Sequence, residues 1–317
     1  MRTPRPWSLP TQPVTRRLLA AAGVTDEMIH TALTSGAVLR LRRGVFVASA
    51  AWPADPAARH VMMAHAEQVA NPDAVLSHQS AAVVWGLPSP SVHEWQDQPA
   101  SATYPKGGSY RSRGGTAVRH VAALPASDVT RDPDGYPVTT VARSAVDLAT
   151  GRPVPEALVI LDAAARQILI SFVGTVRRHD FLNPRLVIAS RDALAAVVGR
   201  ARRLAPVIPL VEPARESAAE SLTAGHLHLE GLPIPLFQPP IRTRLGTVYP
   251  DFFWEEPRLI GECDGAVKGS DPTAYVREKE REQALRDDDY RFVRWLGKEI
   301  MFTPSVVIAR IERALAA

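Results

Sequence analysis

Residues 248–265 read VYPDFFWEEPRLIGECDG and decide the fold of the C-terminal third of the chain. Aromatic and aliphatic side chains fill both halves of this stretch, as is typical of strands, and the acidic piece between them fits a hairpin loop. If Trp254 pairs with Leu259, Asp251 lies directly opposite Glu262, with both side chains on one face of the sheet. The sequence therefore predicts two facing carboxylates beside a short hairpin.

Facing carboxylates point to a metal ion. Like charges about 5 Å apart destabilise a hairpin, so a chain that keeps them needs a cation to neutralise them. Mg²⁺, or Mn²⁺ in its place, takes hard oxygen ligands, here the carboxylates of Asp251 and Glu262 and the backbone carbonyl of Cys263. The ion would lower the pKa of an attacking water and stabilise the charge that builds on a phosphodiester. The pattern thus predicts metal-dependent hydrolysis, and the alternative reading is a solvent-facing acidic hairpin.

The elements around the hairpin predict a layered α/β domain. Pro206, Pro209 and Pro213 mark a linker in front of it. The expected helices are 214–230, 272–288 and 304–316, and the expected strands are 236–243, 247–254, 258–264 and 290–295. A helix, three strands, and then helix, strand and helix is the order of an α/β sandwich.

Residues 12–49 read as helix, turn, helix and basic hairpin. Thr25 caps the second helix, and alternation in the hairpin sets two leucines on one face and Arg40 and Arg42 on the other. This order is typical of a winged helix-turn-helix, whose second helix enters the major groove while the hairpin meets phosphates. The DNA-binding candidates are His30, Thr31 and Thr34 on the helix and Arg40, Arg42 and Arg43 in the hairpin. A small helical domain with solvated arginines is the alternative reading.

The middle of the chain carries no catalytic signature. Its expected helices are 55–70, 78–85, 141–149 and 154–168. His60 and His65 are five positions apart, the wrong spacing to share a metal on one helix face. His78 reads as a packed or capping histidine. The chain also lacks the motifs of a phosphate-binding loop or a nucleophile elbow.

Length and composition indicate how many domains these segments can form. A chain of 317 residues with 46% apolar residues allows two or three domains with real cores. We therefore expect an α/β multidomain protein: a winged helix at 1–52, an α+β middle region at 53–205, and a restriction-endonuclease-like α/β/α domain at 206–317. The lone cysteine, Cys263, excludes an internal disulfide and a cysteine-rich zinc site, which suits the reducing cytoplasm. We expect no signal peptide and no membrane span.

The C-terminal motif resembles a nuclease signature. Pro250-Asp251, followed after ten residues by Glu262-Cys263-Asp264, is similar to the PD-(D/E)xK motif. The helix YVREKEREQALR and the strand YRFVRW around it look like the Vsr-like branch of those endonucleases. The resemblance implies a DNA endonuclease in which Asp251 and Glu262 hold the metal and Arg281 and Arg294 contact phosphate. The catalytic residues that it implies are Glu220, Asp251, Glu262, Asp264 and Lys268.

One position departs from that signature. Asp264 stands where the general motif has lysine, so a cation near the scissile phosphate must come from elsewhere. Lys268, on the loop after the motif, and Lys279, on the following helix, are the candidates. If neither reaches the phosphate, hydrolysis is in doubt.

The front of the chain resembles a second family. Residues 12–49, together with HQSAAVVWGLP at 78–88 and VTTVARSAVDLA at 138–149, look like the AbiEi-family antitoxins of type IV toxin–antitoxin systems. This resemblance implies an N-terminal winged helix that binds operator DNA. A cognate toxin or a second copy of the chain is the partner that it implies besides DNA.

These patterns and resemblances allow two main functions and a third alternative. The first is a Mg²⁺-dependent endonuclease delivered by the winged helix, for defence or DNA repair. The second is an antitoxin-like repressor whose nuclease-like domain does not cleave, and the third is an interaction protein with a decayed site. Three carboxylates within about 5 Å of one point would favour the enzyme, because a divalent ion is held by several oxygens at once.

Overall fold

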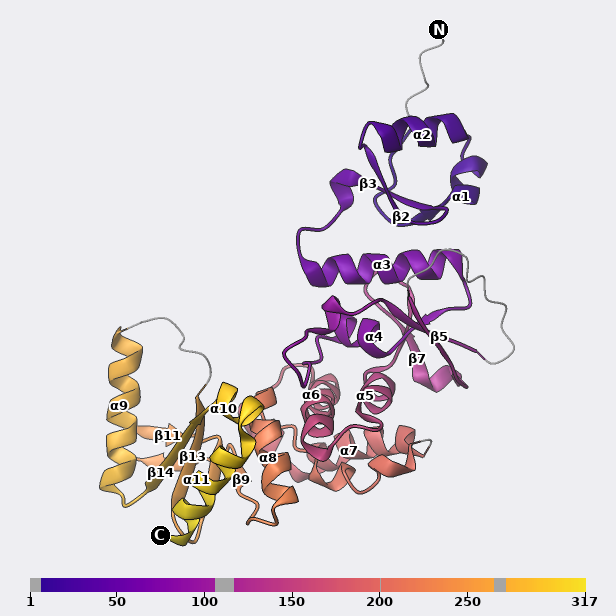
Figure 1. Cartoon of the computed structure of the whole chain (residues 1–317). Helices are drawn as coiled ribbons and strands as arrows, with labels where there is room; N and C mark the ends of the chain where they lie inside the picture. The colour runs from indigo at the N-terminus through magenta and orange to yellow at the C-terminus, as the bar shows by residue number, and fades with distance from the viewer. Residues whose placement is uncertain (1–6, 106–116, 200, 265–271) are drawn as a thin grey trace. The chain divides into compact units, whose positions relative to one another are not determined.

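The computed structural model describes residues 7–105, 117–199, 201–264 and 272–317, with side chains in the last range from Lys279 onward (Figure 1). The chain forms two compact units. The N-terminal unit is Met1–Leu87 with His93–Ser144, and the C-terminal unit is Pro88–Val92 with Ala145–Ala317. Their limits differ from the expected segments 1–52, 53–205 and 206–317, which remain predictions. The structure is a mixed α/β protein with several sheets.

The N-terminal unit begins with two short helices and a small sheet. Its first elements are β1 (Val14–Thr15), α1 (Arg16–Ala21), α2 (Asp26–Thr34), β2 (Val38–Arg42) and β3 (Val45–Ala48). The strands lie in the order β1-β3-β2. The Thr25 hydroxyl accepts a hydrogen bond from the Met28 amide and caps α2, as its residue type predicts. Leu19, Ile29 and Phe46 belong to the core between the helices and the sheet.

Strand β2 carries a bulge that the sequence did not predict. Arg40 pairs with Phe46 and Arg42 with Val45, so the register shifts between the two arginines. A bulge turns the next side chain away from its expected face. The Arg42 side chain is only 7% exposed and forms an ion pair with Glu67, whereas Arg40 is exposed. The prediction that the two arginines share a solvent face is therefore wrong.

The rest of the N-terminal unit is a five-stranded sheet with helices. The elements are α3 (Pro56–Ala70), β4 (Val75–Leu76), α4 (His78–Trp85), β5 (Ser101–Tyr104), β6 (Val118–Val121), β7 (Val129–Arg131) and β8 (Pro137–Thr139), with short 3-10 turns at Ser49–Ala51, Trp95–Asp97 and Ala126–Asp128. The strand order is β6-β5-β4-β8-β7. Helix α5 (Val141–Ala149) continues into the C-terminal unit. The helices expected in this region are confirmed.

The C-terminal unit contains a helical part and a second sheet (Figure 1). The helices are α6 (Val154–Val173), α7 (Pro184–Val198), α8 (Ala218–Leu229), α9 (Pro272–Asp287), α10 (Gly297–Phe302) and α11 (Pro304–Ala316), with 3-10 turns η4 (Arg178–Leu182), η5 (Arg202–Leu204) and η6 (Ile208–Leu210). The strands are β9 (Leu236–Phe237), β10 (Ile241–Thr243), β11 (Gly246–Val248), β12 (Phe252–Trp254), β13 (Leu259–Asp264) and β14 (Arg291–Leu296). The main sheet has the order β14-β13-β12-β9, and β10 and β11 form a separate hairpin.

The predicted hairpin register is confirmed, because Trp254 pairs with Leu259. Strand β14 pairs with β13 in parallel, while β12 is antiparallel to both β13 and β9. The two expected strands at 236–243 and 247–254 are each interrupted near a proline. Proline has no N–H to donate to the ladder, which explains the breaks at Pro239 and Pro250. Helices α7 and α10 were not expected.

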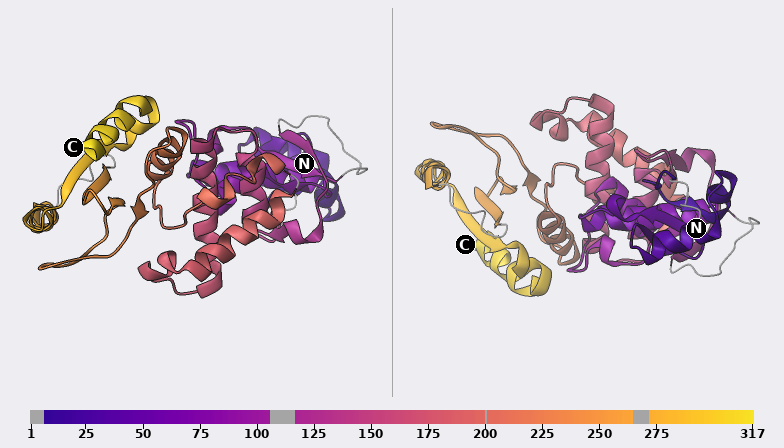
Figure 2. Two further views of the ribbon diagram at one scale, coloured as in Figure 1. Left: turned by 90° about the horizontal axis from the view of Figure 1, so that it is seen from below. Right: turned by 90° about the horizontal axis from the view of Figure 1, so that it is seen from above.

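Helices cover both faces of this sheet (Figures 1 and 2). Phe252, Trp254 and Trp295 pack on one face in a core shared with α8, α10 and α11. Ile260 packs on the other face with Leu285 of α9. The alternation places Phe253 and Ile260 on the α9 face, and Glu262, two positions further along β13, falls on that face as well. None of the described helices is both long and apolar enough to cross a membrane.

Candidate carboxylate site and nucleic-acid surface

Asp251 lies at the start of β12 and is held by two neighbouring segments. Its Oδ2 accepts a hydrogen bond from the Cys263 amide of β13 at 2.9 Å. Its Oδ1 accepts one from Nε2 of Gln238, directly after β9, at 3.0 Å. The Asp251 carboxylate therefore links β13 to the segment that follows the edge strand β9.

Glu220 comes to the same place from the first turn of α8. Ser217 and Glu216 hold it, through a hydrogen bond of 2.7 Å from the Ser217 hydroxyl and one of 3.0 Å from the Glu216 amide. The residue is 4% exposed. Burial, followed by the negative charge of Asp251, raises the pKa of Glu220 to about 7. The charge of Asp251 thus acts on Glu220, and the acidic cluster that the resemblance implies stays a prediction.

The pKa of Asp251 is also raised. Burial is the largest cause, and the hydrogen bonds from Cys263 and Gln238 oppose it. The charges of Glu216 and Asp264 add to the rise. Burial and the negative charges of Asp251, Glu220 and Asp264 raise the pKa of the Cys263 thiol, so it stays protonated at neutral pH. The site is therefore a region of excess negative potential.

Arg294 of β14 lies close to three further carboxylates. Its guanidinium lies 3.1 Å from Glu282, 3.6 Å from Asp264 and 3.7 Å from Glu262. The parallel register sets Glu262 directly beside Arg294, which explains the contact. Glu282 was not among the predicted residues. It lies on α9, and only the packing of that helix against β14 brings it here.

A polar pocket of about 320 Å³ opens beside these groups. Its lining includes Arg178, Tyr249, Glu262, Arg281, Glu282 and Arg294. Arg281 and Arg294, the expected phosphate contacts, thus share a pocket with one expected metal ligand. Lys279 forms an ion pair with Glu282 at 3.1 Å. Lys268 lies outside the described residues.

The types of side chain at the site suit a metal ion, but their arrangement does not form a ready metal site. Carboxylate oxygens of Asp251, Glu262 and Glu220 are the ligands that Mg²⁺ prefers. Among the described residues, however, no group of three or more His, Cys, Asp or Glu side chains is arranged to hold a metal ion. The metal set of Asp251, Glu262 and the Cys263 carbonyl therefore stays a prediction.

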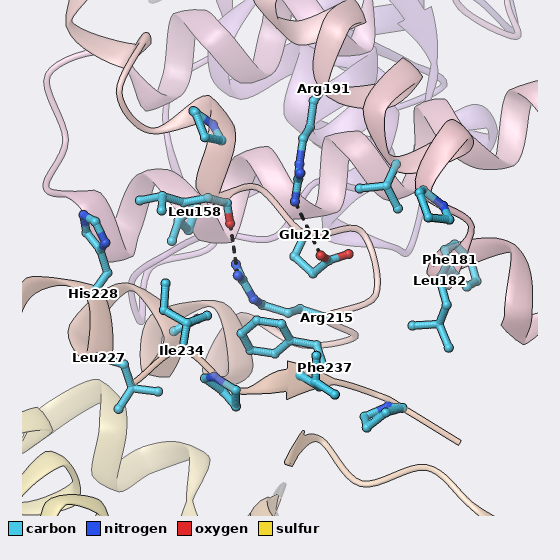
Figure 3. Close-up of a pocket in the computed structure, with 18 of the residues that line it drawn as sticks. Leu158, Phe181, Leu182, Arg191, Glu212, Arg215, Leu227, His228, Ile234 and Phe237 are labelled. Carbon is cyan, nitrogen blue, oxygen red and sulfur yellow. Dashed lines mark hydrogen bonds and ion pairs between the residues drawn. The ribbon is translucent and has the colours of Figure 1, made fainter. Parts of the chain in front are cut away.

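A larger, apolar pocket of about 580 Å³ lies elsewhere in the C-terminal unit (Figure 3). Two arginines of its lining form contacts with other groups of the protein. Arg215 donates to Asp162 at 2.7 Å and to the Leu210 carbonyl at 3.0 Å, and its guanidinium lies 4.2 Å from the Phe237 ring centre. Arg191 contacts Glu212 at 3.5 Å. These contacts hold Phe237 in place immediately before Gln238.

The candidate DNA-binding residues of the N-terminal unit fall into two groups. His30, Thr31 and Thr34 are exposed along α2, and Arg40 and Arg43 are exposed in the hairpin. Arg42 is buried against Glu67 and presents no charge to a phosphate. DNA contact by the exposed residues remains a prediction, since exposure is only its precondition.

The N-terminal unit also contains several buried or packed histidines, and each has a partner within the unit. Nε2 of His65 lies 2.6 Å from Asp132, and Nε2 of His60 lies 2.8 Å from the Ser80 hydroxyl. His78 stacks on His120 with ring centres 3.5 Å apart. Burial, followed by the charges of His120 and Arg143, lowers the pKa of His78 to about 3. The region holds paired, packed histidines, as predicted for His78.

Residues 73–172 match the AbiEi antitoxin C-terminal domain. The matched range contains the HQSAAVVWGLP segment and the VTTVARSAVDLA segment, and it covers less than half of the chain. Residues 12–49 and the carboxylate site lie outside it. A comparison with curated proteins found no match to the chain. The AbiEi-like region suggests a role in a toxin–antitoxin or defence system.

Proposed function

We propose that this protein binds DNA in a toxin–antitoxin or defence system and that its C-terminal unit is a Vsr-like, PD-(D/E)xK-type endonuclease dependent on Mg²⁺ or Mn²⁺. Asp251 and Glu262 hold the metal with the Cys263 carbonyl, and Glu220 and Asp264 complete the acidic cluster. The winged helix formed by α1, α2 and the β2–β3 hairpin delivers the enzyme to DNA.

One observation carries the enzymatic part of the proposal. Glu220 and Asp251 come from different segments, Glu220 is buried, and the charge of Asp251 is the second cause, after burial, that raises the pKa of Glu220 to about 7. Buried like charges are unfavourable unless something neutralises them. A divalent cation bound there would relieve the repulsion, lower the pKa of a bound water, and neutralise charge on a phosphodiester.

The chain's own residues would do the remaining work. Cys263 and Gln238 fix the Asp251 carboxylate through the two hydrogen bonds at 2.9 and 3.0 Å. Arg281 and Arg294 line the adjoining pocket and would bind the phosphate backbone. The sheet supports this assignment, because β13 pairs antiparallel with β12 and parallel with β14, and helices cover both faces.

A second function, a non-cleaving antitoxin-like repressor, has its own support. Arg294 already lies within ion-pair distance of Glu262 and Asp264, so a protein cation neutralises these carboxylates. The described residues contain no ready cluster of three metal-binding side chains. The AbiEi match at 73–172 is also independent of any catalytic residue. In this reading the C-terminal unit binds DNA or a toxin without hydrolysis.

Cleavage of plasmid and linear duplex DNA by the full chain separates the two functions. With Mg²⁺ or Mn²⁺, we expect hydrolysis that EDTA abolishes. Asp251→Asn and Glu262→Gln should each lower the rate by at least about 100-fold, because a lost metal ligand removes several kcal/mol of transition-state stabilisation. Glu256→Gln is the matched control, since Glu256 is exposed on the hairpin loop of the same strands.

The controls decide what a negative result means. Each variant must keep the circular dichroism spectrum and melting temperature of the wild type. Asp251→Asn cleaving at the wild-type rate would overturn the endonuclease assignment. A wild-type chain that binds duplex DNA but cuts nothing in either metal would favour the repressor.

A further inference from the structure

Arg178 reaches the carboxylate site from a part of the chain far from the motif. It begins η4, between α6 and α7, and lines the same polar pocket as Glu262, Arg281 and Arg294. Its side chain is 44% exposed. The residue lies in the segment that sequence analysis assigned to the middle region, so its place in the site arises from the fold alone.

The turn that carries Arg178 is firmly anchored. In a 3-10 helix, residues three apart lie above each other on one side, so Arg178 and Phe181 share a side of η4. Phe181 is 6% exposed in a core with Leu169 and Ala214, and Phe237 of β9 packs against that core. Phe237 is the residue immediately before Gln238. The packing therefore fixes Arg178 next to the end of β9.

Gln238 connects Arg178 with Asp251. Nη1 of Arg178 donates to Oε1 of Gln238 at 2.9 Å, and Nε2 of Gln238 donates to Oδ1 of Asp251 at 3.0 Å. The guanidinium only donates and an ionised carboxylate only accepts, so the two partners define the orientation of the amide. Gln238 is 4% exposed, which protects both hydrogen bonds from water.

The charge of Arg178 is only partly offset. Its nearest carboxylate, Glu216, lies 3.7 Å away, too far for a hydrogen bond. The guanidinium also lies over the Tyr249 ring at 4.8 Å from its centre, which orients the planar group without neutralising it. A half-exposed, oriented guanidinium beside a polar pocket suits a phosphate oxygen, because its fork of donors matches phosphate geometry.

We propose that Arg178 is a phosphate-binding residue of the carboxylate site and that Gln238 is its positioning residue. Arg178 takes the place of the cation that the motif lacks, since Asp264 occupies the position of the usual lysine. This inference rests on the proposed function in one respect, namely that the pocket binds nucleic acid. It needs no metal, because the contact is made by the chain's own cation.

The test is binding of the full chain to fluorescein-labelled duplex DNA, measured by anisotropy in EDTA across a range of salt concentrations. Arg178→Gln should lower the slope of log affinity against log salt by about one, because one phosphate contact is lost. Arg178→Lys should keep the wild-type slope, because the charge remains. Arg185→Gln, an exposed arginine at the start of α7, should change neither slope nor affinity.

Gln238→Met separates positioning from charge. We expect a weaker affinity with an unchanged salt slope, because no cation is lost. The double variant with Arg178→Gln should bind no more weakly than Arg178→Gln alone, since in EDTA the amide contributes to DNA binding through the arginine. Melting temperatures close to wild type confirm that each variant is folded.

Two results would overturn the inference: a wild-type salt slope in Arg178→Gln, or no binding of duplex by the wild type. Failure of hydrolysis is distinguishable from either. If the wild type does not cleave in Mg²⁺ but Arg178→Gln still loses one unit of slope, the endonuclease is wrong and the phosphate contact stands.

Discussion

The two units bury charge in opposite ways. In the N-terminal unit, Glu67 is surrounded by donors: it pairs with Arg42 and accepts hydrogen bonds from Tyr104 at 2.9 Å and Asn71 at 2.8 Å. In the C-terminal unit, Glu220 lies near the like charge of Asp251, and both carboxyls have a raised pKa. Glu67 and Glu220 are both buried, whereas Asp251 is half-buried.

The difference indicates which buried charges stabilise the fold and which have a functional role. A buried ion pair whose carboxylate accepts several hydrogen bonds is a structural feature, and removing one partner is costly. A buried carboxyl whose pKa is raised partly by a like charge does nothing for the fold, so its presence points to a ligand that neutralises it. Arg215 with Asp162, a buried pair at 2.7 Å, shows that the C-terminal unit also contains the first kind.

The largest expected effect breaks the compensated pair. Arg42→Ala should lower the free energy of unfolding by about 3–5 kcal/mol, because Glu67 is left as a buried charge without its partner. Arg40→Ala is the matched control on the same strand and should change stability by less than about 0.5 kcal/mol. Urea unfolding of the two variants measures both values. Equal effects would show that burial does not distinguish these arginines.

Replacing Glu220, the uncompensated carboxyl, should change how the free energy of unfolding depends on pH. The pKa of Glu220 rises on folding from 4.5 to about 7, so the folded state favours the protonated form. Its stabilisation is fully present below pH 4.5 and is lost as the pH rises through about 7. At about 1.4 kcal/mol per pKa unit, the wild type should lose roughly 3 kcal/mol across that window relative to Glu220→Gln.

Urea unfolding of the wild type and Glu220→Gln at pH 5 and pH 8 measures this difference. A constant gap between the two proteins at both pH values would mean that folding does not raise the pKa of Glu220. Mg²⁺ should recover part of the loss at pH 8 in the wild type if the proposed metal site exists, because binding to the folded state stabilises it.

The smallest effect concerns the hairpin arginines. Arg40→Gln and Arg43→Gln should each lower the salt slope of duplex binding by about one, with little change in stability. Arg42→Gln should do the reverse, with a large loss of stability and no loss of slope in the protein that remains folded. Anisotropy titrations at several salt concentrations give the slopes. A slope change in Arg42→Gln alone would reverse the roles assigned to the two kinds of arginine.

Local patterns predicted the elements well. The pairing of Trp254 with Leu259 follows from hydrophobic alternation and a short loop, and both are properties of adjacent residues. The helix expected at 55–70 likewise has its own cap in Asp55, and both it and the helix at 304–316 have a proline in the first turn. Whether a segment forms a helix or a strand depends largely on residues close to it in the sequence, so a single sequence is enough to predict it.

The contacts that define the site depend on distant residues and could not be predicted. Arg178 meets Gln238 across 60 positions, and no periodicity links a 3-10 turn to the end of a strand. The bulge after Arg40 shifts Arg42 into contact with Glu67, and strict alternation cannot express such a shift. Glu220 and Asp251 were placed together by resemblance to a nuclease family, not by the residues alone.

Gln238 adopts a left-handed backbone conformation with φ 51°, which favours glycine. For a residue with a side chain this conformation is strained by roughly 1–2 kcal/mol. Glycine would relieve the strain and remove the amide between Arg178 and Asp251. A search for thermostable variants would therefore select a change here that disconnects the two residues. At this position, thermal stability and function impose opposing requirements on the same side chain.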